Sequence, residues 1–220
     1  MNAMQLHICG IKPFLNLSGI EYVTGERKAR ILAYTRAEDK ARCLAAGLLL
    51  RMVCGVTGES MVRYGANGKP YRRDGGGFFN LSHAGDYVVL GTAGSEIGMD
   101  IEKIDSYSMG VATRCFTPPE LAWLSRESGN EAFYRLWTGK ESVMKGIGLG
   151  LSLAPEDFCI LPMDRSAHRI ASRTWFLDWL SYDGHIVCIA IENKTEETRL
   201  VPVSASDLCR GVIFSPNNGA

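Results

Sequence analysis

Two stretches of the chain repeat one order of elements, and this order constrains the fold more than any other feature. In each stretch a long helical pattern comes first and short apolar strands follow, with the helices predicted over about 35–53 and 131–145. The strands are predicted at 87–93, 96–102, 173–180 and 185–191. A chain with this order is expected to fold as two similar α+β halves packed against each other.

A sparse internal similarity supports the same division. The segment "SHAGDYVVLGT" (82–92) shares a Ser, a Gly and one Val with "SYDGHIVCIAI" (181–191), and "LAAG" (44–47) is similar to "LWTG" (136–139). We therefore predict an α+β fold with a pseudo-twofold arrangement of two similar α/β subdomains. The predicted divisions are an N-terminal half (1–108), a C-terminal half (109–205) and a disordered tail (206–220).

Local signals place the boundaries of several elements. Thr35 and Glu38 form a capping-box pattern at the start of the first long helix, and Thr117 and Glu120 form another before a shorter helix. The Gly-Ser pair at 94–95 predicts a tight turn that would join two strands into a hairpin. Further elements are expected as a basic helix at 24–34, a hairpin and loop at 60–80, and strands at 5–12, 157–162 and 199–203.

Composition and charge exclude several classes of function. The chain has 24 Lys and Arg against 24 Asp and Glu, so its charge predicts neither a nucleic-acid nor a membrane partner. Its seven cysteines are odd in number and form no C-x-x-C pair, which favours buried reduced thiols over disulfides or a zinc site. The N-terminus lacks the pattern of a signal peptide, and the apolar stretch 44–56 is too short to span a bilayer. These features predict a cytoplasmic protein.

The segment "IGMDIEKI" (97–104) carries two carboxylates inside an apolar strand. Because side chains alternate along a strand, Asp100 and Glu102 lie on one face, where their charges repel each other and their burial is costly. One interpretation is a hard cation held by carboxylate oxygens, with Mg²⁺ the first candidate. The alternative is the solvated outer face of an edge strand, where an acidic pair needs no ligand.

The predicted helix over 131–145 presents an apolar stripe in which Lys140 is the exception. A lysine that points toward a core needs an anionic partner. Glu141 and Lys145 flank the stripe one turn apart, and their simplest explanation is a surface ion pair worth about 0.3–0.5 kcal/mol. That explanation does not account for Lys140.

A third polar segment, "NLSHAGD" (80–86), follows the "GKP" of residues 68–70. Ser82 and His83, at the entrance of a strand with backbone amides nearby, could hold a phosphate. The alternative is that they are ordinary polar loop groups. A serine hydrolase is disfavoured, because no G-x-S-x-G elbow surrounds Ser82.

Taken in order, these segments resemble the 4′-phosphopantetheinyl transferases, specifically the long single-chain Sfp type. The matching pieces are "GERKAR" (25–30), "AEDKAR" (37–42), "GKP" (68–70), "FNLSH" (79–83), "GMDIEKI" (98–104), "FTPPE" (116–120) and "WTGKESVMKGIGLGL" (137–151). The specific part is G-x-D-I-E followed by W-x-x-K-E-S-x-x-K, and the resemblance runs from about residue 5 to residue 192.

The resemblance implies a transferase. Such an enzyme moves the phosphopantetheine arm of coenzyme A to a serine of an apo acyl or peptidyl carrier protein, and adenosine 3′,5′-bisphosphate leaves. By the same resemblance, Asp100, Glu102 and Glu141 match Mg²⁺ ligands, and Lys145 faces the pyrophosphate of coenzyme A. Glu141, or a water on the metal, would be the base for the carrier serine. Mg²⁺ and a lysine suit this reaction because negative charge grows on phosphate oxygens.

Further matches concern coenzyme A. The residues matched to its 3′-phosphate are Arg27, Arg30 and His83, and those matched to its other parts are Arg42, Lys69 and Ser82. Cys43 is a departure, because relatives often carry a hydroxyl side chain there. Arg27 and Arg30 stand where lysine is frequent, which keeps the charge and permits bidentate phosphate contacts.

The resemblance also implies a monomer with one site, since both halves of the fold lie in one chain. The segment "IAIENK" (189–194) lacks the D-x-E pair, so a single metal site is expected. Segment 106–116 is a candidate carrier contact, through Met109 and Phe116, although core packing also explains Phe116; Glu120 is explained by its cap. Two alternatives stay open: a non-catalytic coenzyme A-binding protein on the same scaffold, and another metal-dependent phosphoryl enzyme such as a pyrophosphohydrolase.

Overall fold

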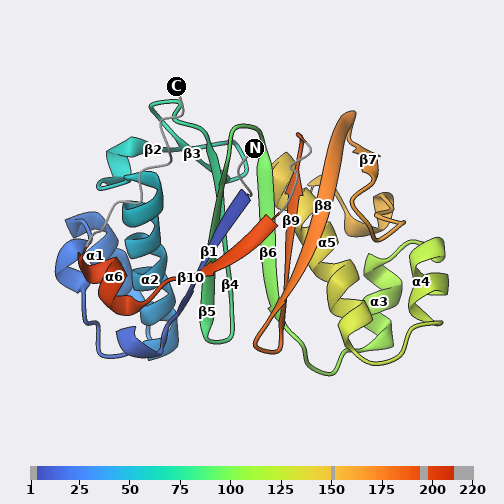
Figure 1. The fold of residues 1–220 in the computed structure, drawn as a ribbon, viewed down its shortest axis with the longest axis horizontal. Helices are drawn as coiled ribbons and strands as arrows, with labels where there is room; N and C mark the ends of the chain where they lie inside the picture. The colour runs from blue at the N-terminus through green and yellow to red at the C-terminus, as the bar shows by residue number, and fades with distance from the viewer. Residues whose placement is uncertain (1–3, 150–151, 194–197, 211–220) are drawn as a thin grey trace.

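The computed structural model of the chain describes residues 4–149, 152–193 and 198–210. Strands form the middle of the molecule, and helices gather at its two ends (Figure 1). The helices are α1 (Gly25–Ala33), α2 (Ala37–Cys54), α3 (Met109–Cys115), α4 (Pro118–Leu124), α5 (Glu131–Ile147) and α6 (Ala205–Arg210). This arrangement confirms the predicted α+β class.

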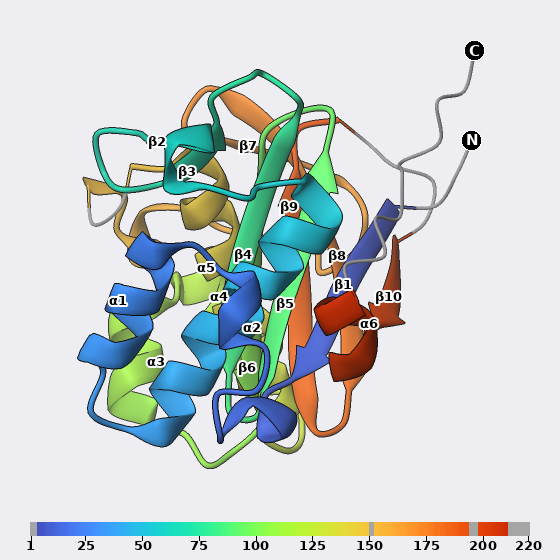
Figure 2. The same cartoon turned by 90° about the vertical axis from the view of Figure 1, so that its left-hand side faces the viewer.

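The first sheet belongs mainly to the N-terminal half. Its strands are, in spatial order, β10 (Thr198–Pro202), β1 (Met4–Gly10), β5 (Tyr87–Ala93) and β4 (Phe78–Ala84). β1 is parallel to β10 and antiparallel to β5. Figure 2 shows α1 and α2 on one face of this sheet, where leucines of α2 are fully buried. Because β10 comes from the far end of the chain, it ties the two halves together.

The second sheet belongs mainly to the C-terminal half. Its strands are, in spatial order, β6 (Ile97–Lys103), β9 (His185–Ile191), β8 (Arg173–Tyr182) and β7 (Ala167–Ile170). Helix α5 lies directly against β6, and glycine permits this close approach. A Cβ added at Gly98 would collide with the backbone of Ser142 and Gly146 on α5. The helix and the strand that carry the predicted acidic residues are therefore in backbone contact.

The predicted hairpin between 87–93 and 96–102 is wrong. Both strands exist, but β5 lies between β1 and β4, so both of its edges are occupied. β6 instead pairs with β9, and residues 94–95 carry the chain from one sheet to the other. The hairpin predicted within 60–80 is confirmed as β2 (Val62–Tyr64) paired with β3 (Pro70–Arg72).

Side chains of β4 join the two sheets. β4 ends the first sheet and β6 ends the second. The Asn80 side-chain oxygen accepts a hydrogen bond from the Met99 amide at 3.0 Å, and the Ser82 hydroxyl accepts one from the Ile101 amide at 3.4 Å. Apolar side chains from both sheets pack beside this seam, among them Leu6, Ile8, Val89, Ile97, Met99, Ile101, Val187 and Ile189. The predicted boundary at residue 108 stays a prediction.

Two local predictions fail for identifiable reasons. The Thr35–Glu38 capping box is wrong, because α2 starts at Ala37 with Arg36 as its N-cap and no side-chain cap. The strand predicted at 157–162 is wrong, because side chains bind the backbone of this segment. Lys140 donates to the carbonyls of Pro155 and Phe158, and the Ile160 amide donates to Glu120. Two strands were not predicted: β4, which is as long as β5 and β6, and the four-residue β7. The Thr117–Glu120 capping box is confirmed at the start of α4.

The end of the described chain is helical rather than disordered. Residues 206–210, predicted as part of a disordered tail, belong to α6. Leu208 of this helix is buried in the core beneath α2, which explains why the segment is ordered. The rest of the predicted tail, 211–220, lies outside the described residues.

Candidate active site

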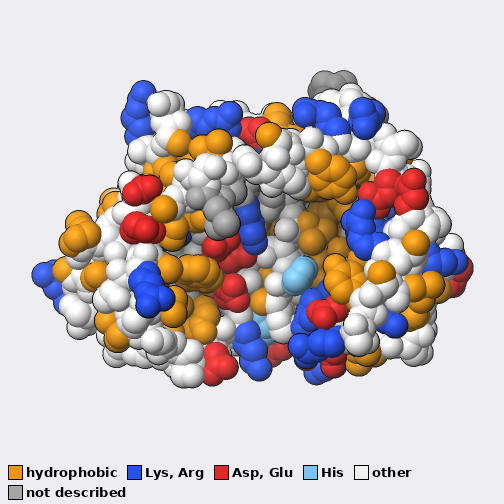
Figure 3. Space-filling model, turned by 180° about the vertical axis from the view of Figure 1, so that it is seen from behind, with side chains coloured by type: hydrophobic (Ala, Val, Ile, Leu, Met, Phe, Trp, Pro, Cys, Tyr) orange, Lys and Arg blue, Asp and Glu red, His pale blue; other side chains and the backbone are white. Residues whose placement is uncertain are grey.

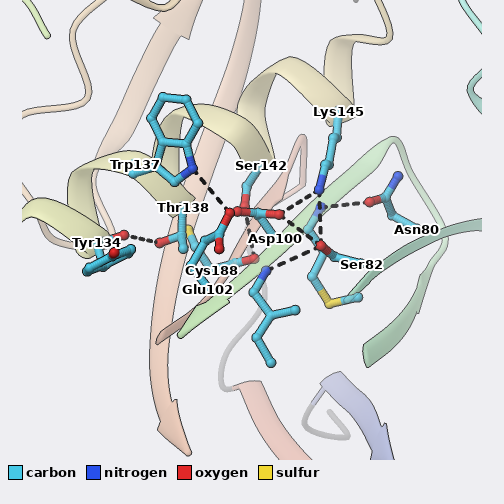
Figure 4. Close-up of polar contacts among 12 residues, drawn as sticks. Asn80, Ser82, Asp100, Glu102, Tyr134, Trp137, Thr138, Ser142, Lys145 and Cys188 are labelled. Atoms are coloured by element: carbon cyan, nitrogen blue, oxygen red, sulfur yellow. Dashed lines mark hydrogen bonds and ion pairs between the residues drawn. The ribbon is translucent and has the colours of Figure 1, made fainter. Parts of the chain in front are cut away.

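The two carboxylates of β6 occupy different surroundings. Asp100 is only 3% exposed, so the solvated-face alternative is wrong for it. Its Oδ1 accepts hydrogen bonds from the Ser82 hydroxyl at 2.8 Å and from Lys145 Nζ at 2.5 Å. Its Oδ2 is buried and has no hydrogen-bond partner among the described residues. Figure 4 shows Asp100 facing both Ser82 and Lys145, which also contact each other, with Glu102 beside it.

Helix α5 supplies the other charged groups. Lys145 forms its ion pair with Asp100 on β6, so a surface pair along the helix does not explain this residue. Trp137 donates its ring N–H to Glu102 Oε1 at 3.3 Å. Ser142 donates its hydroxyl to the Cys188 carbonyl on β9 at 2.9 Å. These three contacts hold the helix on the sheet and fix the direction in which its polar face points.

The carboxylates affect each other's protonation. The pKa of Glu102 is raised to about 7, first by burial and then by the charge of Asp100, against the hydrogen bond from Trp137 and the charge of Lys145. Burial and Asp100 also raise the pKa of Glu141, against Lys145. The site thus holds more negative charge than its single lysine offsets, which a bound cation would relieve.

One cavity brings six predicted site residues together. Its lining consists of Leu81, Ser82, His83, Asp100, Glu102, Trp137, Glu141 and Lys145. It lies in the hollow between the two halves, where Figure 3 shows acidic side chains beside a basic one. Across the described ranges, no three His, Cys, Asp or Glu side chains converge as a ready metal site.

A second, basic cavity adjoins the first. Its lining consists of Arg27, Arg30, Tyr34, Asp39, Arg42, Cys43, Ala46, Leu81 and His83. Leu81 and His83 line both cavities, so the two lie side by side. We call the pair the hollow; it is basic at one end and acidic at the other. Cys43, the predicted departure from the family pattern, is half-buried in the basic end.

Acidic residues and a carbonyl orient the three arginines. Arg27 and Arg30 form ion pairs with Glu59 at 3.3 and 3.5 Å. Arg42 pairs with Asp39 at 2.7 Å, and its Nε and Nη2 donate to the Gly85 carbonyl at 3.1 and 2.8 Å. Neither Glu59 nor Gly85 stood out in the sequence, because a glutamate before a short strand and a glycine in a turn have ordinary structural explanations.

His83 connects the two ends of the hollow. Its pKa is lowered by desolvation in the hollow and then by the positive charges of Arg42 and Lys145. At pH 7 the imidazole is therefore neutral in the free protein. A neutral imidazole can still donate one hydrogen bond to an anion.

Lys69 is the predicted site residue that lines neither cavity. Its ammonium pairs with Glu96 at 2.5 Å and donates to the Gly146 carbonyl at 2.5 Å. The side chain is buried, and burial lowers its pKa against the opposing effect of Glu96. The structure gives it a role in joining elements, which the sequence did not indicate.

Lys140 has the anionic partner that the sequence required. It forms an ion pair with Glu120 at 2.8 Å, and both side chains are fully buried. Lys140 also donates to the Pro155 and Phe158 carbonyls at 2.6 and 2.5 Å. Glu120 also accepts from the Thr117 amide and hydroxyl, each at 2.8 Å. The structural explanation of Glu120 is confirmed, since it caps α4 and neutralises Lys140.

Comparisons with known proteins agree with this geometry. The profile of the 4′-phosphopantetheinyl transferase superfamily matches residues 96–194. The 4′-phosphopantetheinyl transferase ffp of Bacillus subtilis is 33% identical over 150 residues, which cover 64% of this chain and 67% of the relative. The Sfp transferase of Bacillus subtilis is 31% identical, with the same 64% and 67% covered. A putative 4′-phosphopantetheinyl transferase of Synechocystis is 31% identical over 199 residues, which cover 79% of this chain and 78% of the relative. With six of the predicted site residues lining one cavity, these similarities show that the chain belongs to the 4′-phosphopantetheinyl transferase superfamily.

Proposed function

We propose that this protein transfers the 4′-phosphopantetheine arm of coenzyme A to a serine of an apo carrier protein. The observation that carries the proposal is the pair of adjoining cavities, basic at the arginines and acidic at Asp100, Glu102 and Glu141. The basic end complements the negative 3′-phosphate of coenzyme A. The acidic end would meet the pyrophosphate, which is also negative, through a bound divalent cation. Adenosine 3′,5′-bisphosphate is the expected second product.

The basic end is proposed to bind the nucleotide. Arg27, Arg30 and His83 would hold the 3′-phosphate, and Arg42 would contact a neighbouring part of coenzyme A. The ion pairs with Glu59 and Asp39 support this role, because they orient the guanidinium groups before the ligand arrives. Arginine suits phosphate, since its planar fork can make two parallel hydrogen bonds.

The acidic end is proposed to hold a divalent cation, with Mg²⁺ the first candidate. Asp100, Glu102 and Glu141 offer oxygen ligands, which hard cations prefer. The Oδ2 of Asp100, which is buried and has no hydrogen-bond partner among the described residues, is free to bind a cation. The raised pKa values of Glu102 and Glu141 show that negative charge is crowded here, and a cation would relieve this crowding. The pyrophosphate of coenzyme A would complete the coordination shell. When bound, Mg²⁺ would neutralise charge that builds on the phosphate oxygens.

Two residues of α5 are proposed to act directly on the reaction. The serine oxygen forms a bond to the β-phosphorus of coenzyme A, and the bond from that phosphorus to the departing bisphosphate breaks. Glu141 is proposed to accept the serine proton, and its raised pKa strengthens it as a base. Lys145, whose Nζ also donates to the Ser82 hydroxyl at 3.1 Å, would place its charge against the departing phosphate.

The carrier protein is proposed to dock beside the acidic end. A groove there is lined by Glu102, Ser106, Tyr107, Ser108, Val111, Phe133, Tyr134 and Trp137, so it shares Glu102 and Trp137 with the acidic cavity. Met109 and Val111 at its edge are 55% and 43% exposed. Phe116 is excluded as a contact, because it is buried in the core against Phe133.

We further propose that one chain suffices and that it works in the cytoplasm. A single chain lines both cavities, which supports a monomer. The seven cysteines are free thiols, which is usual in a reducing compartment. Among the helices that the structure describes, none is long and apolar enough to cross a membrane.

Mass spectrometry of carrier proteins tests the proposal. The protein is incubated with coenzyme A and Mg²⁺ and with a panel of apo acyl and peptidyl carriers. We expect at least one carrier to gain the mass of the phosphopantetheine arm. Tight coenzyme A binding with no mass gain on any carrier would favour a non-catalytic binding protein. Release of the bisphosphate without any carrier would instead indicate a pyrophosphohydrolase.

A further inference from the structure

The loop of the β2–β3 hairpin binds the C-terminal end of α5. Lys69 Nζ donates to the Gly146 carbonyl at 2.5 Å, and the Asn67 side-chain amide donates to the Gly148 carbonyl at 3.1 Å. The last carbonyls of a helix have no partner within the helix. A lysine at this end also interacts favourably with the helix dipole. The hairpin, far from α5 in sequence, thus completes the end of that helix.

The same ammonium also reaches the start of β6. Lys69 Nζ pairs with Glu96 Oε2 at 2.5 Å, and Glu96 directly precedes the first residue of β6. Gly146 directly follows Lys145 on α5. One buried side chain therefore joins the strand that carries Asp100 to the helix that carries Lys145.

Lys69 is poorly placed to bind a ligand with its side chain. The residue is 7% exposed and lines neither end of the hollow. Two of the three N–H groups of its ammonium already donate to Glu96 and Gly146, so at most one is left for a phosphate. Its carbon chain also packs against Gly148, with 3.1 Å from Lys69 Cδ to a Cβ built on that glycine.

We propose that Lys69 is a positioning residue that fixes α5 relative to β6, rather than a side-chain contact to coenzyme A. Its ammonium contacts the start of β6, the strand that carries Asp100. It also contacts the C-terminal end of α5, the helix that carries Glu141 and Lys145. This inference rests on the proposed transferase function for its effect on turnover. The joining contact itself does not depend on that function.

The test compares two variants that break the same ion pair from opposite sides. Lys69→Met removes the ammonium, and Glu96→Gln removes its anionic partner without touching Lys69. Lys12→Met is the control, because Lys12 forms an exposed pair with Asp86 at 3.1 Å elsewhere on the surface. Amide hydrogen exchange without ligand reports on the end of α5 and the start of β6. Turnover with an apo carrier and the binding of adenosine 3′,5′-bisphosphate are measured on the same samples.

We expect Lys69→Met and Glu96→Gln to have similar effects. Exchange at residues 145–148 and 97–99 should be about tenfold faster or more in both, because local opening becomes easier. Turnover should fall about 10- to 100-fold in both, since small displacements of reacting groups are costly. Bisphosphate affinity should stay within about twofold of the unmodified protein. The double variant should be no worse than the stronger single variant.

A different pattern would overturn the inference. If Glu96→Gln matches the unmodified protein while Lys69→Met alone weakens bisphosphate binding, Lys69 acts as a ligand contact. Unchanged exchange at both elements in both variants would also refute the positioning role. If the unmodified protein modifies no carrier, the proposed function fails, and the exchange comparison still decides the role of Lys69. Should Lys69→Met fail to fold, Glu96→Gln and Asn67→Ala provide the same comparison.

Discussion

Removal of the buried charge at Lys140 is expected to destabilise the protein strongly. Lys140 and Glu120 are 2.8 Å apart and have no exposed surface. Lys140→Met keeps the length of the side chain but leaves the Glu120 carboxylate uncompensated in the core. Breaking such a pair from one side costs about 3–5 kcal/mol. For a chain of this size that corresponds to a fall in Tm of about 6–20 °C.

Urea unfolding and thermal unfolding of Lys140→Met measure this cost. A control on the same helix is Glu131→Gln, which removes the exposed pair of Glu131 with Arg135 at 4.0 Å and should change stability by about 0.5 kcal/mol or less. Combining Lys140→Met with Glu120→Gln should cost less than the sum of the two single variants, because no bare charge remains buried. A loss below about 1 kcal/mol in Lys140→Met would refute the reasoning.

Four further outcomes follow from the site. Asp100→Asn and Glu141→Gln should each lower transfer about 100-fold or more while circular dichroism stays unchanged, and near-normal transfer would remove them from the site. The pKa of Glu102 is raised to about 7 in the folded protein, so without metal the Tm should fall as the pH rises from about 5 to 8. Added Mg²⁺ should reduce that fall. A Tm that rises over this pH range would contradict the raised pKa of Glu102. Val111→Asp should raise the KM for the carrier protein and leave bisphosphate binding unchanged; equal losses in both would argue against docking at the groove. Cys43→Ser restores a hydroxyl and should tighten bisphosphate binding about 2- to 10-fold by calorimetry, whereas weaker binding would show that the thiol is the better fit.

The acidic site was predictable because its charged residues are close together in the sequence, at spacings that place them on one face of a strand or of a helix. Alternation along a strand put Asp100 and Glu102 on one face, and helical spacing put Glu141 and Lys145 one turn apart. The resemblance then joined the two segments, and the structure lines one cavity with all four. The need of Lys140 for an anion was also visible. The identity of its partner was not, because Glu120 already had a sufficient explanation as a helix cap.

The pairing of strands was less predictable than their existence. The turn signal at 94–95 was read as a hairpin, yet β5 and β6 enter different sheets. A turn pattern reports local backbone preference and does not say which edge of a strand is already occupied. The strand predicted at 157–162 failed for a related reason. Its backbone groups bind Lys140 and Glu120, and no local pattern reveals such distant partners.

The seam between the sheets explains why the site lies there. A regular sheet would use the outer amides of β6 for backbone pairing, but here Asn80 and Ser82 accept from two of them through side chains. Ser82 also donates to Asp100 and accepts from Lys145, so the residue that joins the sheets also orients the charged pair. In the free protein the ion pair with Lys145 already offsets the charge of Asp100. Among the described residues, neither Glu102 nor Glu141 forms an ion pair of this kind. A cation that took over the neutralisation of Asp100 would leave the lysine charge available to the pyrophosphate. The seam thus brings together Asp100, the proposed cation ligand, and Lys145, the proposed pyrophosphate contact, on two elements that meet at this junction of the fold.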